Sequence, residues 1–194
     1  MFTNDKRQEE RTGKYGTPRQ QHLQQLVTQF QNPTISEQSK EKIVANLANF
    51  AYDPYNFAFL RDLNILELFL DCLTDDEPNE RIIEFSVGGI CNAIADPQNA
   101  KFVFDCGGIE PLIGCLMSPV RNTVKYAIVG LYYMWVNGGS EVRKSLKEKD
   151  DLVELIRKYS EVNEFANLAK ALLANIMPGA LWEMEGKKGG KWDW

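Results

Sequence analysis

The residues that most often perform chemistry in proteins are sparse in this chain and are not placed to act together. The single histidine, His22, would have to serve any Ser–His or Cys–His pair, and the sequence places no second member beside it. One histidine also cannot form a multi-histidine metal site. The glycine pairs at 88–89 and 107–108 lack the spacing of a phosphate-binding loop, and the carboxylates at 75–77 lie in a polar loop. We therefore expect no catalysis, no cofactor and no bound metal.

The cysteines also favour a structural role. They fall within or beside apolar patterns typical of helices, at Cys72, Cys91, Cys106 and Cys115. No two of them have the Cys-x-x-Cys spacing of a zinc or redox site, and Cys72 and Cys115 occupy the same position of a repeat. We expect reduced thiols, most of them buried.

Asparagine is the polar residue whose spacing is regular. The motif Asn-x-x-x-Asp-Pro-x-Asn begins at Asn49 and again at Asn92, 43 residues later. In a third copy Trp135 occupies the position of the first asparagine, and in a fourth Asn175 comes three residues early, which we attribute to a trimmed loop. Within the motif, Asp-Pro is typical of an N-cap followed by proline at the first helical position.

The elements that position these residues repeat with the same period. Apolar residues at offsets 0, 3, 4 and 7, the spacing of one helix face, begin at Leu23, Leu66, Ile109 and Leu152, each 43 residues after the one before. A fixed period of about 20–50 residues is the signature of a solenoid, in which each unit buries its apolar face on its neighbours. One unit is predicted to contain a short helix, a second helix and a longer third helix, repeated about four times.

The bulk composition limits the class of partner and the compartment. A net charge of −5 and a pI of about 5.1 disfavour a general nucleic-acid binder, which usually carries a basic domain. No apolar run reaches the ~18 residues of a membrane span, and the N-terminus lacks the apolar core of a signal peptide. We expect a protein of the cytosol or the nucleus.

Composition divides the chain into three parts. Residues 1–20 are polar and mildly basic, contain glycine and proline breakers, and are predicted to be a flexible arm. Residues 21–177 form the repeat domain. Residues 178–194 form a tail with three tryptophans. Trp182 is expected to cap the last repeat, whereas Trp192 and Trp194 are candidates for insertion into a partner's pocket.

Several features together resemble the armadillo repeat. They are three helices per unit, a period of 42–43 residues, the run Gly-Gly-Ile-x-x-Leu-Ile-x-Cys-Leu at 107–116, and Gly-Ile-Cys-Asn at 89–92. The resemblance covers about residues 20–177. It implies an all-α fold, a short right-handed armadillo α-solenoid of about four three-helix units. Segments 44–54 and 84–92 resemble one small member of the family more closely.

The family resemblance also implies a binding surface. In armadillo proteins the third helices line a concave groove, where an asparagine near the end of each helix grips the backbone of an extended peptide. Here that role falls to Asn49, Asn92 and Asn175, since one amide supplies both a donor and an acceptor. The alternative for these asparagines is capping of the loop that follows a helix.

Three aromatic residues belong to the same implied surface. Trp135 is either a contact in the groove or a core residue of the neighbouring unit, and Tyr52 and Phe85 would extend the groove. Importin-type repeats carry a tryptophan four residues before the asparagine. This chain has Ala45, Gly88, Leu131 and Ala171 there, which argues against recognition of nuclear-localisation signals.

The closer resemblance implies a non-catalytic protein-interaction scaffold of the nucleus. It implies a component of the minor spliceosome that acts in pre-mRNA splicing with a protein partner carrying an RNA-recognition motif. Two alternatives stay open: a peptide-binding adaptor outside splicing, and direct contact with RNA through the basic arm together with Lys144, Lys147 and Lys149. Steep salt dependence of RNA affinity would favour the RNA alternative.

Overall fold

Every regular element in the described part of the chain is a helix. The structure is a computed structural model that describes residues 3–12, 16–75 and 79–178. Its α-helices are α1 (Asp5–Thr12), α2 (Arg19–Phe30), α3 (Glu37–Phe50), α4 (Phe57–Asp62), α5 (Ile65–Leu73), α6 (Glu80–Ala93), α7 (Pro97–Asp105), α8 (Ile109–Gly114), α9 (Arg121–Asn137), α10 (Gly139–Lys147), α11 (Asp150–Ser160) and α12 (Ala166–Ile176). Short 3₁₀ turns, η1 (Pro54–Asn56) and η2 (Cys115–Met117), precede α4 and follow α8. Among the described helices none is long and apolar enough to cross a membrane.

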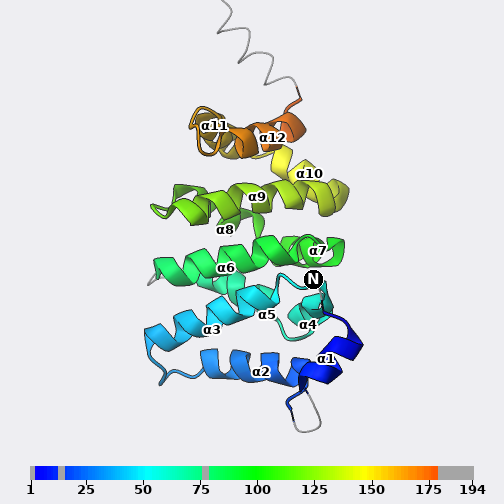
Figure 1. The fold of residues 1–194 in the computed structure, drawn as a ribbon. Helices are drawn as coiled ribbons and strands as arrows, with labels where there is room; N and C mark the ends of the chain where they lie inside the picture. The colour runs from blue at the N-terminus through cyan, green and yellow to red at the C-terminus, as the bar shows by residue number, and fades with distance from the viewer. Residues whose placement is uncertain (1–2, 13–15, 76–78, 179–194) are drawn as a thin grey trace, which may run out of the picture.

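The helices stack as successive three-helix units (Figure 1). The units consist of α1–α3, α4–α6, α7–α9 and α10–α12, and each ends in its third helix. The third helices α3, α6, α9 and α12 lie side by side, and each contacts the next. We call the surface that these helices expose the third-helix face. The all-α fold with repeated three-helix units is thus confirmed.

The predicted apolar stripes form the core. Leu23, Leu66 and Leu152 are fully buried and Ile109 is almost so, as the period of 43 residues requires. Burying one such side chain contributes roughly 1.5–3 kcal/mol relative to leaving it exposed.

The last second helix has a polar outer side. On α5 the side chains of Ile65, Leu68 and Cys72 are buried. The residues 86 positions later on α11 are Asp151, Glu154 and Lys158, all exposed, with an ion pair of 2.8 Å between the last two. Charged residues replace apolar ones because no described helix covers that side of α11, as the end of a solenoid requires.

The repeated Asp-Pro motif starts the corner between two units. Asp53 accepts a hydrogen bond from the backbone N–H of Tyr55 at 3.2 Å, and Asp96 accepts one from that of Asn99 at 3.2 Å. Both aspartates are therefore N-caps, and the proline that follows each needs no hydrogen-bond partner at the first helical position.

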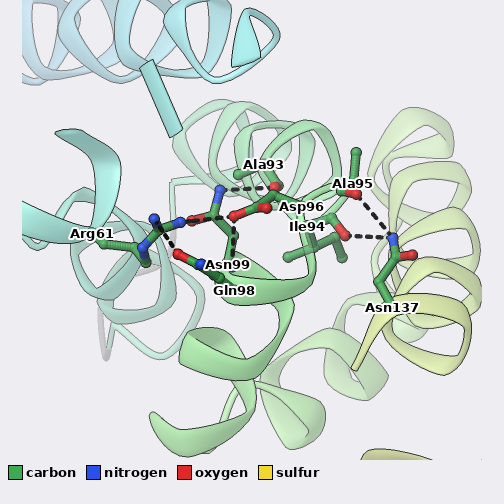
Figure 2. Close-up of polar contacts among 8 residues, drawn as sticks. All are labelled: Arg61, Ala93, Ile94, Ala95, Asp96, Gln98, Asn99 and Asn137. Atoms are coloured by element: carbon green, nitrogen blue, oxygen red, sulfur yellow. Dashed lines mark hydrogen bonds and ion pairs between the residues drawn. The ribbon is translucent and has the colours of Figure 1, made fainter. Parts of the chain in front are cut away.

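The last asparagine of the motif holds the end of the preceding third helix. The Asn56 amide donates to the carbonyl of Phe50 at 2.8 Å, and the Asn99 amide donates to that of Ala93 at 2.9 Å (Figure 2). Both asparagine side chains are buried. The last carbonyls of a helix have no partner within the helix, and a buried carbonyl needs a hydrogen-bond donor. This need explains why a buried asparagine amide is present at both corners.

The third corner bonds carbonyls near the end of its third helix with a different residue. There Gly138-Gly139 stand in place of the motif, and the Arg143 guanidinium donates to the carbonyls of Trp135 at 2.9 Å and Val136 at 3.1 Å. Side chains thus bond carbonyls near the end of the third helix in all three corners.

Arg61 at the end of α4 joins two units at the second corner. Its guanidinium forms an ion pair with Asp96 at 2.8 Å and donates to the side-chain oxygens of Asn99 and Gln98 (Figure 2). The arginine and the aspartate are both largely shielded from solvent, so this ion pair is less screened than those on the open surface.

The polar arm differs from its prediction, because α1 lies within residues 1–20. The backbone N–H of Thr3 donates to the Asp53 carboxylate at 2.9 Å, and Arg19 donates to the side chain of Gln8 at 2.8 Å. Helix α1 occupies the place of the short first helix of its unit. It has no apolar residue, so a search for apolar stripes does not find it.

Candidate functional site

A hollow of about 200 Å³ opens on the third-helix face between α3, α6 and α9. It is bordered by small side chains, two aromatic rings, two amides and one carboxylate. The lining residues are Ala45, Ala48, Asn49, Glu84, Phe85, Gly88, Asn92 and Tyr126. Small-molecule pockets usually have about 300–1,000 Å³. The size of this hollow therefore suits one side chain of a larger partner.

Two of the predicted asparagines border the hollow. Asn49 is exposed on α3 and forms no side-chain hydrogen bond with a described residue. Asn92 is half-buried on α6 and donates to the carbonyl of Ala48 at 3.4 Å, a long bond that links neighbouring third helices. Neither amide caps the loop that follows its helix. Both retain unused hydrogen-bonding groups beside the hollow.

The third predicted asparagine lies apart from them. Asn175 is on α12, and its amide donates to the carbonyl of Ala171 in the same helix at 2.7 Å. It does not line the hollow.

The equivalence of Trp135 with Asn92 is wrong by two residues. Ile82, Ser86, Val87 and Ile90 are the buried residues that set the inner side of α6. On α9 the matching buried residues, each 41 rather than 43 positions later, are Thr123, Ala127, Ile128 and Leu131. Tyr133 therefore occupies the position of Asn92, and Leu131 faces the core instead of the groove.

Loop length explains this shift. Six residues, 74–79, connect α5 to α6, whereas three, 118–120, connect η2 to α9. Helix α9 then has 17 residues against 14 in α6, which restores the period at the next corner. The trimmed loop that the early asparagine indicated is thus placed before α9, one unit earlier than predicted.

Trp135 belongs to the corner between α9 and α10. Its side chain is half-buried against the core, and the Lys147 ammonium lies 5.5 Å from the centre of its ring. It does not line the hollow. Of its two interpretations, the packing agrees with a core residue.

The remaining predicted aromatic residues have different positions. Phe85 is half-buried and lines the hollow. Tyr52 follows the end of α3 and is 65% exposed, outside the hollow. Trp192 and Trp194 lie outside the described residues.

Sequence reasoning missed the tyrosines of α9. Tyr126 and Tyr133 are each 36% exposed, seven residues apart on one helix face. A Cβ added at Gly88 would lie 3.4 Å from the Tyr126 ring, so the ring covers the place where a side chain would extend from α6. The 41-residue offset is the signal that aligns Tyr126 with Phe85 and Tyr133 with Asn92.

Asn137 at the end of α9 was also missed. Its amide donates to the carbonyls of Ile94 at 2.9 Å and Ala95 at 3.2 Å, which ties α9 to the end of α6 (Figure 2). This contact stabilises the third-helix face next to the hollow.

The carboxylates on this face already have partners. Glu41 on α3 accepts from Arg81 at 3.4 Å and from Asn79 at 3.2 Å. Glu84 accepts from the Asn122 amide at 2.7 Å. The charge of Glu41 is thus offset by Arg81, whereas Glu84 keeps its negative charge because its partner is a neutral amide.

The lysines on the same face are unpaired. Lys42 lies one turn before Ala45, and Lys125 directly precedes Tyr126. Both are exposed, and neither forms an ion pair with a described residue. Among the described residues next to the hollow, these two are cations without an ion-pair partner, and Glu84 is a carboxylate without one.

The thiols have the environment of core residues, with one exception. Burial raises the pKa of Cys72 to about 11 and the pKa of Cys91 and Cys115 to about 12, so these thiols stay protonated near neutral pH. Cys106 is exposed. Within residues 3–12, 16–75 and 79–178, no three metal-ligating side chains gather at one place.

The lysines proposed for RNA contact all lie near groups of the chain itself. Lys149 pairs with Glu110, Lys144 lies 3.9 Å from Glu148, and Lys147 lies over the ring of Trp135. They do not form one free basic patch.

Known proteins share this architecture. No family model matches the chain. Over 70 residues it is 54% identical to Armadillo repeat-containing protein 7 of Mus musculus, a match that covers 36% of this chain and about a third, 34%, of the relative.

Solved structures extend the likeness to most of the chain. A designed armadillo repeat protein, YIII(Dq)4CqI, matches with a TM-score of 0.70 at 22% identity, over 79% of this chain and 64% of that one. A second, designed armadillo repeat protein YIII(Dq.V1)4CPAF in complex with peptide (KR)4, matches with a TM-score of 0.69 at 21% identity, over 79% and 64%. A computationally designed armadillo repeat protein for modular peptide recognition gives 0.70 at 24%, over 79% and 63%. The chain therefore has the armadillo-repeat fold, an all-α solenoid of three-helix units.

Proposed function

We propose that this protein is a non-catalytic interaction scaffold whose third-helix face binds an extended segment of a protein partner. The observation that carries the proposal is the pair Asn49 and Asn92, which stand at the same position of successive third helices and border one hollow. An amide can donate to a peptide carbonyl and accept from a peptide N–H at once. Two such amides on neighbouring helices can therefore hold a backbone in a fixed direction.

Two further features support a peptide rather than a small molecule or a substrate. The hollow has room for about one side chain. Its border contains no cysteine or histidine and no unpaired acidic cluster, so hydrogen bonding and contact are the chemistry it offers. Two of the structural neighbours are described as peptide-bound or as made for modular peptide recognition.

Removing the two amides tests the proposal. The double change Asn49→Ala and Asn92→Ala should weaken partner binding by about 1–3 kcal/mol for each backbone bond that loses its partner. Isothermal titration or fluorescence anisotropy with the partner segment measures the change. Asn163→Ala, at an exposed site between α11 and α12, is the matched control. Unchanged affinity of the double variant, with an unchanged melting temperature, would remove the hollow from the function.

We further propose a finer assignment, a nuclear role in the minor spliceosome together with a partner carrying an RNA-recognition motif. The resemblance of segments 44–54 and 84–92 and the identity over 70 residues support it. An affinity pull-down from nuclear extract, read by mass spectrometry and RNA sequencing, tests it. Recovery of one such protein with minor-spliceosome RNAs by the wild type, and its loss in the double variant, is expected. Failure to recover these RNAs with the wild type would overturn the finer assignment and leave the scaffold standing.

A further inference from the structure

The charges beside the hollow specify which peptide would bind there. This inference rests on the proposed function and adds the chemical class of the ligand. Among charged side chains beside the hollow, Glu41 is paired with Arg81, whereas Lys42, Lys125 and Glu84 have no described ion-pair partner, so unpaired cations exceed unpaired carboxylates by one. A cation without a partner is the group that gains most from a ligand of opposite charge, at close range and moderate salt.

The two lysines stand on opposite sides of the hollow. Lys42 is on α3 and Lys125 is on α9, with α6 between them. Packed helices are about 8–10 Å apart, so the two positions are separated by roughly 16–20 Å along the stack. An extended chain advances about 3.3 Å per residue. Carboxylates about five or six residues apart in a peptide would therefore meet the two ammonium groups.

The hollow between them favours an aromatic or bulky apolar side chain. Its small residues Ala45 and Gly88 leave the space open, and the rings of Phe85 and Tyr126 border it. Aromatic rings prefer edge-to-face or offset contacts with another ring. The Glu84 carboxylate is held by the neutral amide of Asn122 at 2.7 Å and keeps its charge, so the side chain that enters the hollow itself should be uncharged.

We propose that the third-helix face selects an extended acidic peptide in which one aromatic side chain enters the hollow and flanking carboxylates pair with Lys42 and Lys125. This preference is opposite in charge to that of the structural neighbour solved with the peptide (KR)4. The local surface also differs from the chain as a whole, whose net charge is −5.

Three synthetic peptides of eight residues test the proposal on the full chain. The first is acetyl-Glu-Asp-Gly-Phe-Ser-Gly-Asp-Glu-amide, the second replaces its acids with Gln and Asn, and the third is (Lys-Arg)4. The acidic peptide should bind at least tenfold more tightly than its neutral twin at low salt, and raising the salt should reduce this ratio. The basic peptide should bind most weakly.

Charge reversal shows whether the two lysines cause the preference. Lys42→Glu with Lys125→Glu should abolish the advantage of the acidic peptide. Lys144→Glu, an exposed position on α10 outside the third-helix face, is the matched control and should retain it. Equal binding of the acidic and neutral peptides, or tighter binding of the basic one, overturns the inference.

The outcomes separate this inference from the proposed function. If peptides bind without acidic preference and the Asn49→Ala/Asn92→Ala variant loses them, the peptide-binding face stands and its acidic selectivity is wrong. If none of the three binds, the inference is wrong, and recovery of a partner by the wild type but not by the asparagine variant decides the proposed function separately.

Discussion

Helices α6 and α9 occupy equivalent places in the stack of third helices, but the surfaces that they present to solvent differ. Both pack between two neighbouring third helices, and their buried residues match at a constant offset of 41 positions. The residues toward the third-helix face do not match: α6 has a buried Gly88 and a half-buried Asn92 where α9 has a half-buried Val129 and an exposed Tyr133. Because the buried positions of α9 are displaced together by two residues from the 43-residue period, the packing of the core is preserved. The exposed face is free to change from amide to aromatic, so binding properties can diverge within one array.

The corners after these two helices provide the strongest test of the comparison. Asn99→Ala should cost about 3 kcal/mol of stability, because it removes the amide hydrogen bond to the carbonyl of Ala93, which keeps only the backbone N–H of Asp96 at 3.2 Å, removes a contact with Arg61 and opens a cavity. Arg143→Ala at the next corner should cost about 1 kcal/mol, because Arg143 is exposed and water can replace it. Urea denaturation followed by circular dichroism measures both values.

The conservative variant Asn99→Asp is a useful control at the same corner. It keeps the shape of the side chain and the oxygen that accepts from Arg61, but has no N–H to donate to the carbonyl of Ala93, so it isolates the loss of that one bond and should still be destabilising. Equal losses of stability for Asn99→Ala and Arg143→Ala would mean that the two corners are held with the same strength, contrary to this prediction.

Much of the fold was predictable because the regular spacing of apolar residues can be read directly from the sequence. The stripes at Leu23, Leu66, Ile109 and Leu152 recur at a fixed distance, and burial on the neighbouring unit follows directly. Helix α1 was not predictable in this way, since it has no apolar residue. Its position depends on polar contacts with distant parts of the chain, such as that of Thr3 with Asp53.

The site was predictable only where the period holds. Asn49, Phe85 and Asn92 come together because α3 and α6 keep the spacing of 43 residues. The loop before α9 is shorter than the loop before α6, and α9 is longer than α6, so the repeat period is nearly unchanged over the whole unit. Within α9, however, each position is shifted by two residues relative to that period. Trp135 was therefore assigned to the face that Tyr133 occupies. Tyr126 could not be identified without that register.

Two glycines at equivalent positions of α6 and α9 give the second test. A Cβ at Gly89 would lie 2.6 Å from the buried Phe69 ring, whereas one at Gly130 would meet only ordinary contacts of 3.7–3.9 Å with Leu112 and Ile94. Gly89→Ala should therefore destabilise by about 2 kcal/mol through overpacking. Gly130→Ala should stabilise by up to about 1 kcal/mol, since alanine favours the helix.

Thermal and urea unfolding of both glycine variants measure the difference. Gly114→Ala, where an added Cβ meets nothing within 4 Å, reports the propensity effect without packing. If Gly89→Ala were as well tolerated as Gly130→Ala, the inner sides of the two helices would not differ in tightness as described.

The buried thiol of α6 predicts a third, smaller difference at alkaline pH. Burial raises the pKa of Cys91 to about 12, above the ordinary value near 8.5. The folded state then keeps its proton while the unfolded state loses it, so stability is full below about pH 8.5 and falls as the pH rises toward 12. Between pH 7.5 and 9 this thiol should remove about 1 kcal/mol.

Comparing the pH slopes of the wild type and Cys91→Ala isolates this contribution. The position equivalent to Cys91 on α9 is Tyr132, half-buried rather than buried, so the effect belongs to α6. Burial and neighbouring carboxylates also raise the pKa of the exposed Cys106, so Cys106→Ala should change the slope in the same direction but less. Parallel slopes for the wild type and Cys91→Ala would show that the thiol ionises equally in both states.

The smallest expected effect concerns the exposed faces themselves. Tyr133→Asn would extend the row of amides from Asn49 and Asn92 onto α9, and should raise affinity for an extended peptide about threefold by adding one backbone hydrogen bond of modest net strength. Tyr133→Ala removes the ring without adding an amide and should not raise affinity. The difference between the two variants, measured by titration at constant salt, isolates the amide. If asparagine weakens binding as much as alanine does, the ring of Tyr133 contacts the peptide directly, and α9 contributes to the face through aromatic contact instead of a backbone grip.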